Sequence, residues 1–166
     1  MTVSDRKKAV FLDRDGVINR ERGDYTWLLE DFVLNEGLVE ALCALQRSGY
    51  MLIVISNQSG ISKGIYSRDQ VEYLHAQLTR NLKNKGVVLE EIYYCPHHPD
   101  FSKCICRKPD SLMIEKAVAR FNIDKDSSWF IGDAQRDMDA AIRAGVRAIR
   151  VVANEPLDKV VSQIAG

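Results

Sequence analysis

Short runs of apolar residues alternate along the chain with longer segments in which apolar residues recur every three or four positions. The short runs predict buried strands, and the longer segments predict amphipathic helices. The expected strands span residues 9–13, 51–55, 88–94, 129–131 and 147–152. The expected helices span residues 36–48, 67–85, 111–121, 135–144 and 157–164. This alternation predicts an α/β fold with a doubly wound parallel sheet and right-handed crossovers. For helix 67–85, Ser67 is suited to cap the start and Gly86 to stop the end.

Length and charge narrow the class of protein. The chain has 166 residues, and we expect residues 1–166 to form a single domain. Lysine plus arginine equals aspartate plus glutamate, at 23 each, which argues against a broad surface for nucleic acid or membranes. Residues 1–8 are polar and lack the apolar core of a signal peptide. We therefore expect a cytoplasmic monomer that binds neither nucleic acid nor a membrane.

Polar residues lie at the carboxyl ends of three of the expected strands. Asp13 and Asp15 end the first strand, Ser56 and Asn57 end the second, and Asp133 ends the fourth. The carboxyl ends of parallel strands meet at one edge of a sheet, where open α/β sheets build their sites. The sequence therefore predicts that these side chains converge.

Two carboxylates two residues apart at a strand end suit phosphoryl transfer. We interpret Asp13 as the nucleophile, which forms an aspartyl-phosphate. Asp15 is then the general acid toward the leaving oxygen and the base toward water. Asp13 and Asp133 offer hard oxygen ligands for Mg²⁺. Asp137, one helical turn beyond Asp133, is placed to orient Asp133 or a bound water.

Three further residues complete this hypothesis. Ser56 and the Asn57 amide can bind phosphate oxygens, and Lys108 can place a positive charge on the transferring group. Each signal also has an ordinary explanation. Asp and Gly are common at strand-to-turn junctions, Ser-Asn pairs are common in turns, and a single lysine is usually a solvated surface charge. Their order at matching strand ends favours the active site.

A second cluster carries soft metal ligands. Cys95 and His97 are followed by Cys104 and Cys106, which gives a Cys-x-His…Cys-x-Cys set. Four such ligands suit tetrahedral Zn²⁺ and leave no open position, so the zinc is expected to be structural. It would order the loop between the ligands. The alternative is a set of unrelated thiols and a histidine, and His98 is the neighbour that could replace His97.

Four motifs together resemble those of the haloacid dehalogenase superfamily. They are residues 11–16, 56–57, 108 and 132–137. The resemblance implies a Rossmann-like core, Mg²⁺ and an aspartyl-phosphate mechanism, with Asp15 also donating its backbone carbonyl to the metal. No insertion is long enough for a large cap domain, so short loops must shape the pocket.

A narrower resemblance concerns the substrate. Three segments look like those of the D-glycero-D-manno-heptose 1,7-bisphosphate 7-phosphatases, enzymes of bacterial heptose synthesis for lipopolysaccharide or related glycans. The segments are residues 57–61, 92–99 and 104–109. The resemblance implies a sugar bisphosphate as the small-molecule substrate, with Gln58 and Ser59 among its contacts. The histidinol-phosphate phosphatases share the aspartates and the zinc loop, and they are the alternative.

The polar segment after the first strand is a candidate substrate loop. It consists of Glu21, Arg22, Gly23 and Asp24, and the resemblance implies that it contacts the substrate. The alternative is a solvated connection. Arg107, beside the lysine of the third motif, offers a guanidinium fork for a remote phosphate or for hydroxyls.

One position departs from the heptose phosphatases. They commonly carry lysine directly after the Gly-Asp of the fourth motif, where this chain has Ala134. Arg136 follows two residues later and is placed to compensate for the missing charge.

Two classes of protein other than sugar-phosphate phosphatases also carry some of these features. A phosphoacceptor signalling module has no use for a leaving-group acid such as Asp15, and a zinc-based interaction module has no use for the carboxylates.

Overall fold

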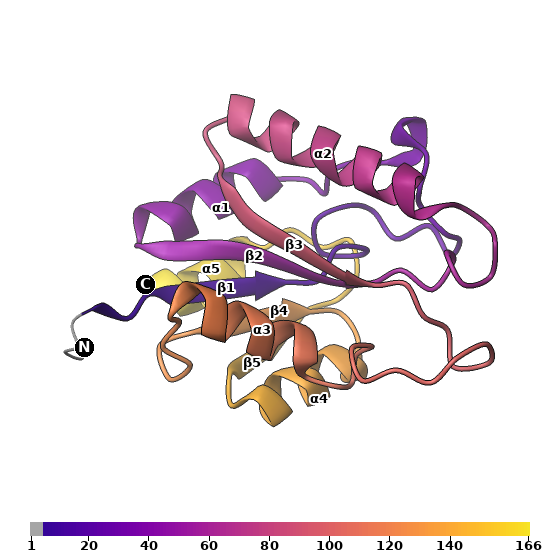
Figure 1. The fold of residues 1–166 in the computed structure, drawn as a ribbon. Helices are drawn as coiled ribbons and strands as arrows, with labels where there is room; N and C mark the ends of the chain where they lie inside the picture. The colour runs from indigo at the N-terminus through magenta and orange to yellow at the C-terminus, as the bar shows by residue number, and fades with distance from the viewer. Residues whose placement is uncertain (1–4) are drawn as a thin grey trace.

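The computed structural model describes residues 5–166, so residues 1–4, the start of the polar stretch 1–8, lie outside the described part. Five parallel strands form one sheet in the order β3-β2-β1-β4-β5 (Figure 1). The strands are β1 Lys8–Leu12, β2 Tyr50–Asn57, β3 Leu89–Cys95, β4 Trp129–Gly132 and β5 Arg147–Arg150. The helices are α1 Leu38–Arg47, α2 Arg68–Asn84, α3 Leu112–Phe121, α4 Gln135–Ala144 and α5 Asp158–Ala165.

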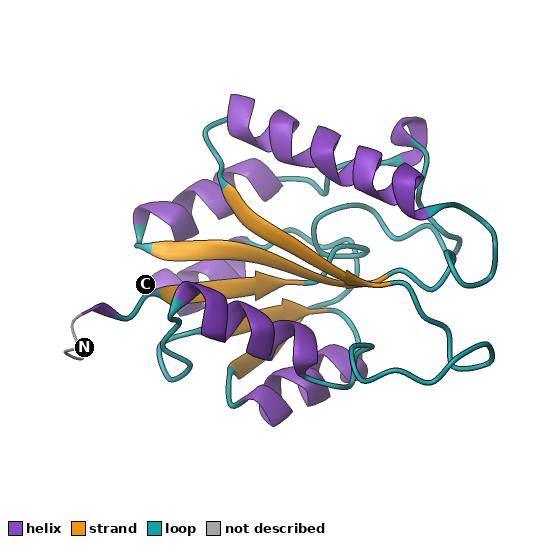
Figure 2. Ribbon diagram, viewed as in Figure 1, coloured by secondary structure: helices purple, strands orange, loops and turns teal. Residues whose placement is uncertain are grey.

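The helices cover both faces of the sheet, which confirms the doubly wound α/β fold (Figure 2). The central strand β1 alternates between two apolar clusters because successive side chains of a strand point to opposite faces. Val10 and Leu12 belong to the cluster built with α1, α2 and α5. Ala9 and Phe11 belong to the cluster built with α3 and α4. All four side chains are fully buried, as a sheet covered on both faces requires.

Two features of the chain differ from the predicted elements. Strand β2 continues beyond its expected end at residue 55, because Ser56 and Asn57 pair with Tyr94 and Cys95 of β3. The neighbouring strand thus overrides the turn tendency of a Ser-Asn pair. A short 3-10 helix, Leu29–Asp31, has no counterpart among the predictions, since three residues are too few to show a period.

The register of the three central strands places their carboxyl ends side by side. Leu12 at the end of β1 lies next to Val54 of β2 and Ile131 of β4. The pairing continues one residue further, because the Asp13 N–H donates to the Ile131 carbonyl at 3.1 Å. The residues that follow β1, β2 and β4 therefore meet at one edge of the sheet.

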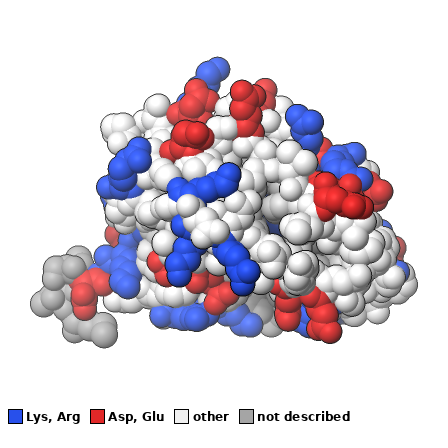
Figure 3. All heavy atoms as spheres, turned by 90° about the horizontal axis from the view of Figure 1, so that it is seen from above, with Lys and Arg blue, Asp and Glu red and all other residues white. Residues whose placement is uncertain are grey.

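Charged residues of both signs are distributed over the surface. Figure 3 shows acidic and basic side chains interspersed on the face that carries α2. This pattern agrees with the equal numbers of acidic and basic residues in the sequence. None of the helices within residues 5–166 combines the length and the apolar character needed to cross a membrane.

Helix α2 begins with a reciprocal cap. The Ser67 hydroxyl accepts a hydrogen bond from the Gln70 N–H at 3.1 Å, and the Gln70 side chain accepts one from the Ser67 N–H at 2.8 Å. Both bonds satisfy amides that the first helical turn leaves without partners. The prediction that Ser67 caps this helix is confirmed, and Gly86 follows the helix with a φ of 86°, a value that glycine adopts without strain.

We expect Ser67→Ala to lower the free energy of unfolding by about 1 kcal/mol, because one capping hydrogen bond is lost. Urea denaturation monitored by circular dichroism measures the change. Ser162→Ala is the matched control, since this exposed serine in α5 donates only to the Asp158 carbonyl within its own helix. The control is expected to change the free energy by less than about 0.5 kcal/mol. Equal losses in both variants would contradict the role of the cap.

Candidate active site

A pocket of about 430 Å³ opens at the carboxyl edge of the sheet, a size common for small-molecule sites. Its lining residues come from the loops after β1, β2 and β3 and from the start of α4: Asp13, Asp15, Glu21, Gly23, Asp24, Tyr25, Thr26, Asn57, Gln58, Ser59, Arg107, Lys108 and Arg136. The structure thus brings most of the expected site residues together. Four expected residues do not line the pocket: Arg22, Ser56, Asp133 and Asp137.

The ammonium group of Lys108 is the buried centre of the site. Only 1% of this side chain is exposed. Its Nζ lies 2.9 Å from Asp13 Oδ1, 2.7 Å from Asp137 Oδ1 and 2.9 Å from the Ile55 carbonyl oxygen. Burial alone would lower the pKa of Lys108, but the two carboxylates outweigh burial and raise the pKa. Lys108 is therefore a fixed positive charge that joins β1, β2 and α4.

Asp13 leaves β1 directly and points one oxygen at protein donors. Its Oδ1 accepts hydrogen bonds from Lys108 Nζ at 2.9 Å and from the Arg14 N–H at 2.8 Å. Burial raises the pKa of Asp13 well above its usual value. Lys108 opposes this shift, whereas Asp137 and Asp133 add to it. The site therefore holds more negative charge than its buried lysine offsets.

Three carboxylates are placed to bind a cation. Asp13, Asp133 and Asp137 each offer an oxygen, and these atoms lie within 4.8 Å of one another. Oδ1 of Asp133 is buried without a hydrogen-bond partner among residues 5–166, an arrangement that is costly unless a cation binds. Gly16 has a φ of 90°, and a Cβ at this position would overlap Oδ2 of Asp133. Hard oxygen ligands in this arrangement fit Mg²⁺.

Asp137 has different neighbours from those expected. The sequence suggested that it orients Asp133 or a bound water. In the structure, its Oδ1 pairs with Lys108, and its Oδ2 accepts a hydrogen bond from the Ala134 N–H at 3.1 Å. A Cβ at Gly132 would overlap the Asp137 side chain, so this glycine permits the close approach. Asp137 thus positions Lys108 and the first turn of α4.

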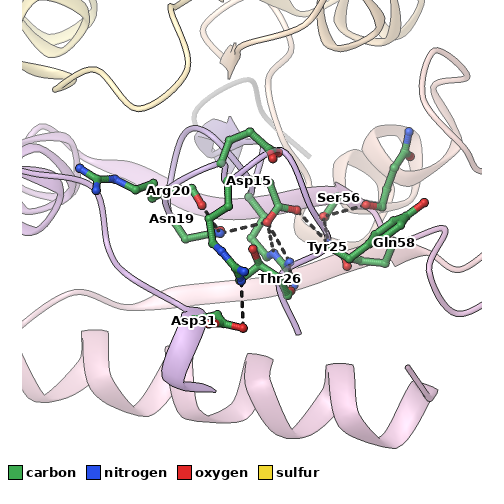
Figure 4. Close-up of polar contacts among 12 residues, drawn as sticks. Asp15, Asn19, Arg20, Tyr25, Thr26, Asp31, Ser56 and Gln58 are labelled. Atoms are coloured by element: carbon green, nitrogen blue, oxygen red, sulfur yellow. Dashed lines mark hydrogen bonds and ion pairs between the residues drawn. The ribbon is translucent and has the colours of Figure 1, made fainter. Parts of the chain in front are cut away.

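Asp15 is held by donors on both of its oxygens. Oδ1 accepts hydrogen bonds from Arg14 Nη2 and Asn19 Nδ2, each at 2.9 Å. Oδ2 accepts one from Gln58 Nε2 at 3.2 Å, and Figure 4 shows Asp15 between Asn19 and Gln58. Burial acts to raise the pKa of Asp15, but the Arg14 charge and these hydrogen bonds outweigh burial and lower the pKa. A quarter of the side chain stays exposed toward the pocket.

Arg14 is fully buried and fixes Asp15 from behind. Its guanidinium donates to the Thr26 carbonyl at 2.6 Å, and its Nη1 lies 3.1 Å from Nε2 of His75 in α2. Burial, reinforced by the Arg14 charge, lowers the pKa of His75 to about 3, so the imidazole is neutral and accepts this bond at Nε2. From the sequence alone, His75 is expected to be an ordinary residue of the long helix. The signal was its place on the apolar face of α2, four residues after Val71.

A second polar chain supports Asp15 from β2. Gln58 Nε2 donates to the Ser56 hydroxyl at 2.8 Å as well as to Asp15, and the Tyr66 hydroxyl donates to Gln58 Oε1 at 2.7 Å. Burial raises the pKa of Tyr66 to about 12, so the phenol stays a donor. Gly60 allows this contact, since a Cβ there would overlap the Tyr66 ring. No spacing in the sequence pointed to Tyr66.

Asn57 ties the end of β2 to the loop that carries Lys108. Its side-chain amide donates to the Lys108 carbonyl at 3.1 Å and accepts from the Lys108 N–H at 3.0 Å. Arg107, the preceding residue, donates to the His97 carbonyl at 3.3 Å and lines the pocket. The two basic residues of this loop therefore differ, because one is buried among acids and the other faces the pocket.

The four soft ligands come together in the loop after β3. Cys95, His97, Cys104 and Cys106 each offer an atom within 4.8 Å of the others. His97 Nδ1 lies 3.4 Å from Cys95 Sγ and 3.3 Å from Cys106 Sγ, and Cys95 Sγ lies 3.7 Å from Cys104 Sγ. Cys106 Sγ lies 2.9 Å from Cys95 Sγ, so these two sulfurs would move apart slightly around an ion. The four ligand types and their proximity suit one tetrahedral Zn²⁺. His98 turns away from the cluster, and its Nδ1 accepts a hydrogen bond from the Asp100 N–H.

The candidate substrate loop reaches the pocket with three of its four residues. Glu21, Gly23 and Asp24 line the pocket, whereas Arg22 forms an ion pair with Asp31 at 2.9 Å. Asn154, which follows β5, holds the loop in place, because its side chain accepts from the Glu21 N–H and donates to the Glu21 carbonyl. No pattern in the sequence points to Asn154, since it lies more than 130 positions from its partner.

Comparison with known proteins agrees with this geometry. The HAD-hydrolase-like family matches residues 105–155. A D-glycero-β-D-manno-heptose-1,7-bisphosphate 7-phosphatase from Haemophilus ducreyi is 44% identical over 147 residues, which is 85% of this chain and 80% of that protein. A D-glycero-α-D-manno-heptose-1,7-bisphosphate 7-phosphatase from Photorhabdus laumondii is 43% identical over 84% of this chain and 79% of its own length.

A solved structure shares the whole fold. The D,D-heptose 1,7-bisphosphate phosphatase from B. bronchiseptica, crystallised with magnesium and phosphate, superposes with a TM-score of 0.83 at 27% identity. The match covers 95% of this chain and 97% of that one. The expected resemblance is therefore confirmed, and the chain belongs to the haloacid dehalogenase superfamily and, within it, to the family of the D-glycero-D-manno-heptose-1,7-bisphosphate 7-phosphatases.

Proposed function

We propose that this protein is a Mg²⁺-dependent phosphatase that removes the 7-phosphate of D-glycero-D-manno-heptose 1,7-bisphosphate through an aspartyl-phosphate. The observation that carries the proposal is the pocket in which Asp13 and Asp15 lie beside Lys108, at the edge of the sheet where Asp133 follows β4. The substrate is inferred from the relatives named above. Three of the four cysteines cluster with His97 as candidate metal ligands and form no disulfides, which supports a reducing, cytoplasmic setting.

In the first step, an Asp13 carboxylate oxygen attacks phosphorus and forms a P–O bond while the bond to the sugar oxygen breaks. Asp15 gives its proton to the leaving sugar oxygen. The Arg14 charge and the hydrogen bonds that lower the pKa of Asp15 favour its carboxylate form in the resting site. Asp15 must therefore take up a proton when the substrate binds, and a negative phosphate beside it would favour that uptake. In the second step, Asp15 takes a proton from water, the water oxygen attacks phosphorus, and Asp13 is released together with inorganic phosphate.

The buried groups hold this arrangement for both steps. Lys108 fixes Oδ1 of Asp13 and neutralises negative charge beside the transferring group. Asp13 and Asp133, with the backbone carbonyl of Asp15, would hold Mg²⁺, which supplies further positive charge to the phosphoryl oxygens. Arg14 and Gln58 keep Asp15 directed at the pocket without reacting themselves.

Phosphate release from a substrate panel tests the proposal. The panel contains both anomers of the heptose bisphosphate, because relatives named for either anomer match this chain at 43–44% identity. It also contains heptose 7-phosphate and histidinol phosphate, each assayed with and without Mg²⁺. We expect fast, Mg²⁺-dependent release from at least one heptose bisphosphate. Faster turnover of histidinol phosphate than of either bisphosphate would overturn the substrate assignment.

Asp13→Asn is expected to reduce kcat on the heptose bisphosphate by at least about a thousandfold, because an amide cannot form the phosphoenzyme. Steady-state phosphate release measures the loss, and circular dichroism verifies the fold. Asp139→Asn is the control, since this residue of α4 contacts Gln135 and does not line the pocket. Retention of more than a few per cent of activity in Asp13→Asn would exclude Asp13 as the nucleophile.

Asp15→Asn separates proton transfer from the other steps. We expect kcat on the heptose bisphosphate to fall by about a hundredfold or more, because its leaving alkoxide needs a proton. The rate of the first step should fall much less for p-nitrophenyl phosphate, since p-nitrophenolate leaves without taking up a proton. A pre-steady-state burst of p-nitrophenol in the variant checks this difference. Equal slowing of the first step for both substrates would show that another group supplies the proton.

We also propose that Zn²⁺ bound by Cys95, His97, Cys104 and Cys106 orders the loop that carries Lys108. Cys104→Ser should contain less than one zinc per chain, exchange its amides faster across residues 96–107 and lose activity. Elemental analysis and hydrogen exchange measure these changes. Cys43→Ser is the matched control, because Cys43 lies in α1, outside the cluster. Full zinc content and activity in Cys104→Ser would contradict the proposal.

A further inference from the structure

The basic residues at the pocket fall into two groups according to their partners. Lys108 lies between Asp13 and Asp137, and the Arg14 guanidinium binds Asp15. These two charges are offset by the carboxylates of the reaction centre. They are not available to a second anionic group on the substrate.

Two guanidinium groups of the pocket lining remain without an acidic partner. Arg107 donates only to the His97 carbonyl among residues 5–166. Arg136 is exposed, and within the same residues it forms neither a hydrogen bond nor an ion pair. Both line the pocket that contains Asp13 and Asp15. The uncompensated positive charge of this pocket therefore comes from Arg107 and Arg136.

The backbone holds Arg136 close to the reaction centre. It is the second residue of α4, and its neighbour Asp137 is fixed by Lys108 and by the Ala134 N–H. The base of the Arg136 side chain is therefore fixed, and the side chain lines the pocket without a hydrogen bond or ion pair among residues 5–166. Ala134, at the start of the same motif, carries no charge, so Arg136 is the basic residue that this motif contributes to the pocket.

The other charged residues of the lining are unsuited to an anion. Glu21 and Asp24 are acidic and would repel a phosphate. Their carboxylates already accept hydrogen bonds from the Gly23 and Tyr25 N–H groups of their own loop. The remaining lone pairs of these carboxylates can accept hydrogen bonds from sugar hydroxyl groups. Among the charged residues of the lining, the two arginines are therefore the groups suited to a second phosphate.

We propose that Arg136 is a specificity residue, which together with Arg107 binds the phosphate that stays on the sugar and selects bisphosphates over monophosphates. This inference rests on the proposed function, since it takes the substrate to be a sugar bisphosphate. A guanidinium that binds a phosphate oxygen forms charge-assisted hydrogen bonds, which are stronger than neutral ones. Arg136 contributes to binding and is not required for the chemistry at Asp13.

The test compares heptose 1,7-bisphosphate with heptose 7-phosphate on the wild-type protein and on Arg136→Gln. The variant should raise KM for the bisphosphate by about 10- to 100-fold and change kcat little. Its KM for the monophosphate should change less than about threefold. Arg136→Lys should recover part of the loss. Arg143→Gln is the matched control, because Arg143 lies on the same helix and pairs with Asp110 outside the pocket.

A binding measurement gives a second readout. Heptose 1-phosphate, the product that keeps only the second phosphate, should inhibit the wild type competitively and Arg136→Gln at least tenfold more weakly. Equal effects of Arg136→Gln on both substrates, or an unchanged inhibition constant, would overturn the inference while the proposed function stands. A wild-type protein that hydrolyses heptose 7-phosphate as efficiently as the bisphosphate would likewise overturn the inference. Failure of the wild-type protein to release phosphate from either anomer of the heptose bisphosphate would overturn the proposed function itself.

Discussion

The burial of one ammonium among carboxylates is the constraint on which the site depends. Lys108 can stay charged in the interior only because Asp13 and Asp137 approach it to within 3 Å. These partners come from β1 and from α4, and a third contact is the Ile55 carbonyl of β2. Removing the lysine would leave two buried carboxylates without their cation, so the position of Asp13 is set by the same interaction that stabilises the centre of the fold.

Loops rather than regular elements deliver most of the remaining groups, and each loop is attached at a defined point. Asn57 hydrogen-bonds the backbone of Lys108, and the cysteine and histidine ligands cluster in the same loop after β3. Asn154 fixes the loop after β1 at Glu21. Such attachments offset the entropy that ordered loops cost. They also explain how a chain with only short segments at this edge of its sheet can form a defined pocket.

The sequence predicted those features of the fold and the site that depend on the local pattern of apolar and polar residues. Strand ends could be located from apolar runs, and so the convergence of Asp13 with Asp133 could be expected before any coordinates. Contacts between helices and loops that are distant in the sequence could not be predicted, because no spacing of residues along the chain indicates them. The contact of Arg14 with His75 joins residues 61 positions apart, and a buried histidine on an apolar helix face has no unique interpretation. The pairing of Lys108 with Asp137 likewise required the packing of α4 against the sheet.

The excess of acids over bases at the reaction centre has a consequence for the order in which ligands arrive. Asp13, Asp15, Asp133 and Asp137 face only Lys108 and Arg14, which leaves the bare centre electronegative. A doubly charged phosphate entering it would be repelled, whereas a divalent cation would be attracted. The electrostatics therefore favour a divalent cation over a phosphate as the first ligand of the bare centre. If the cation binds first, a protein without it would leave the sugar phosphate in solution instead of holding it in a complex that cannot turn over.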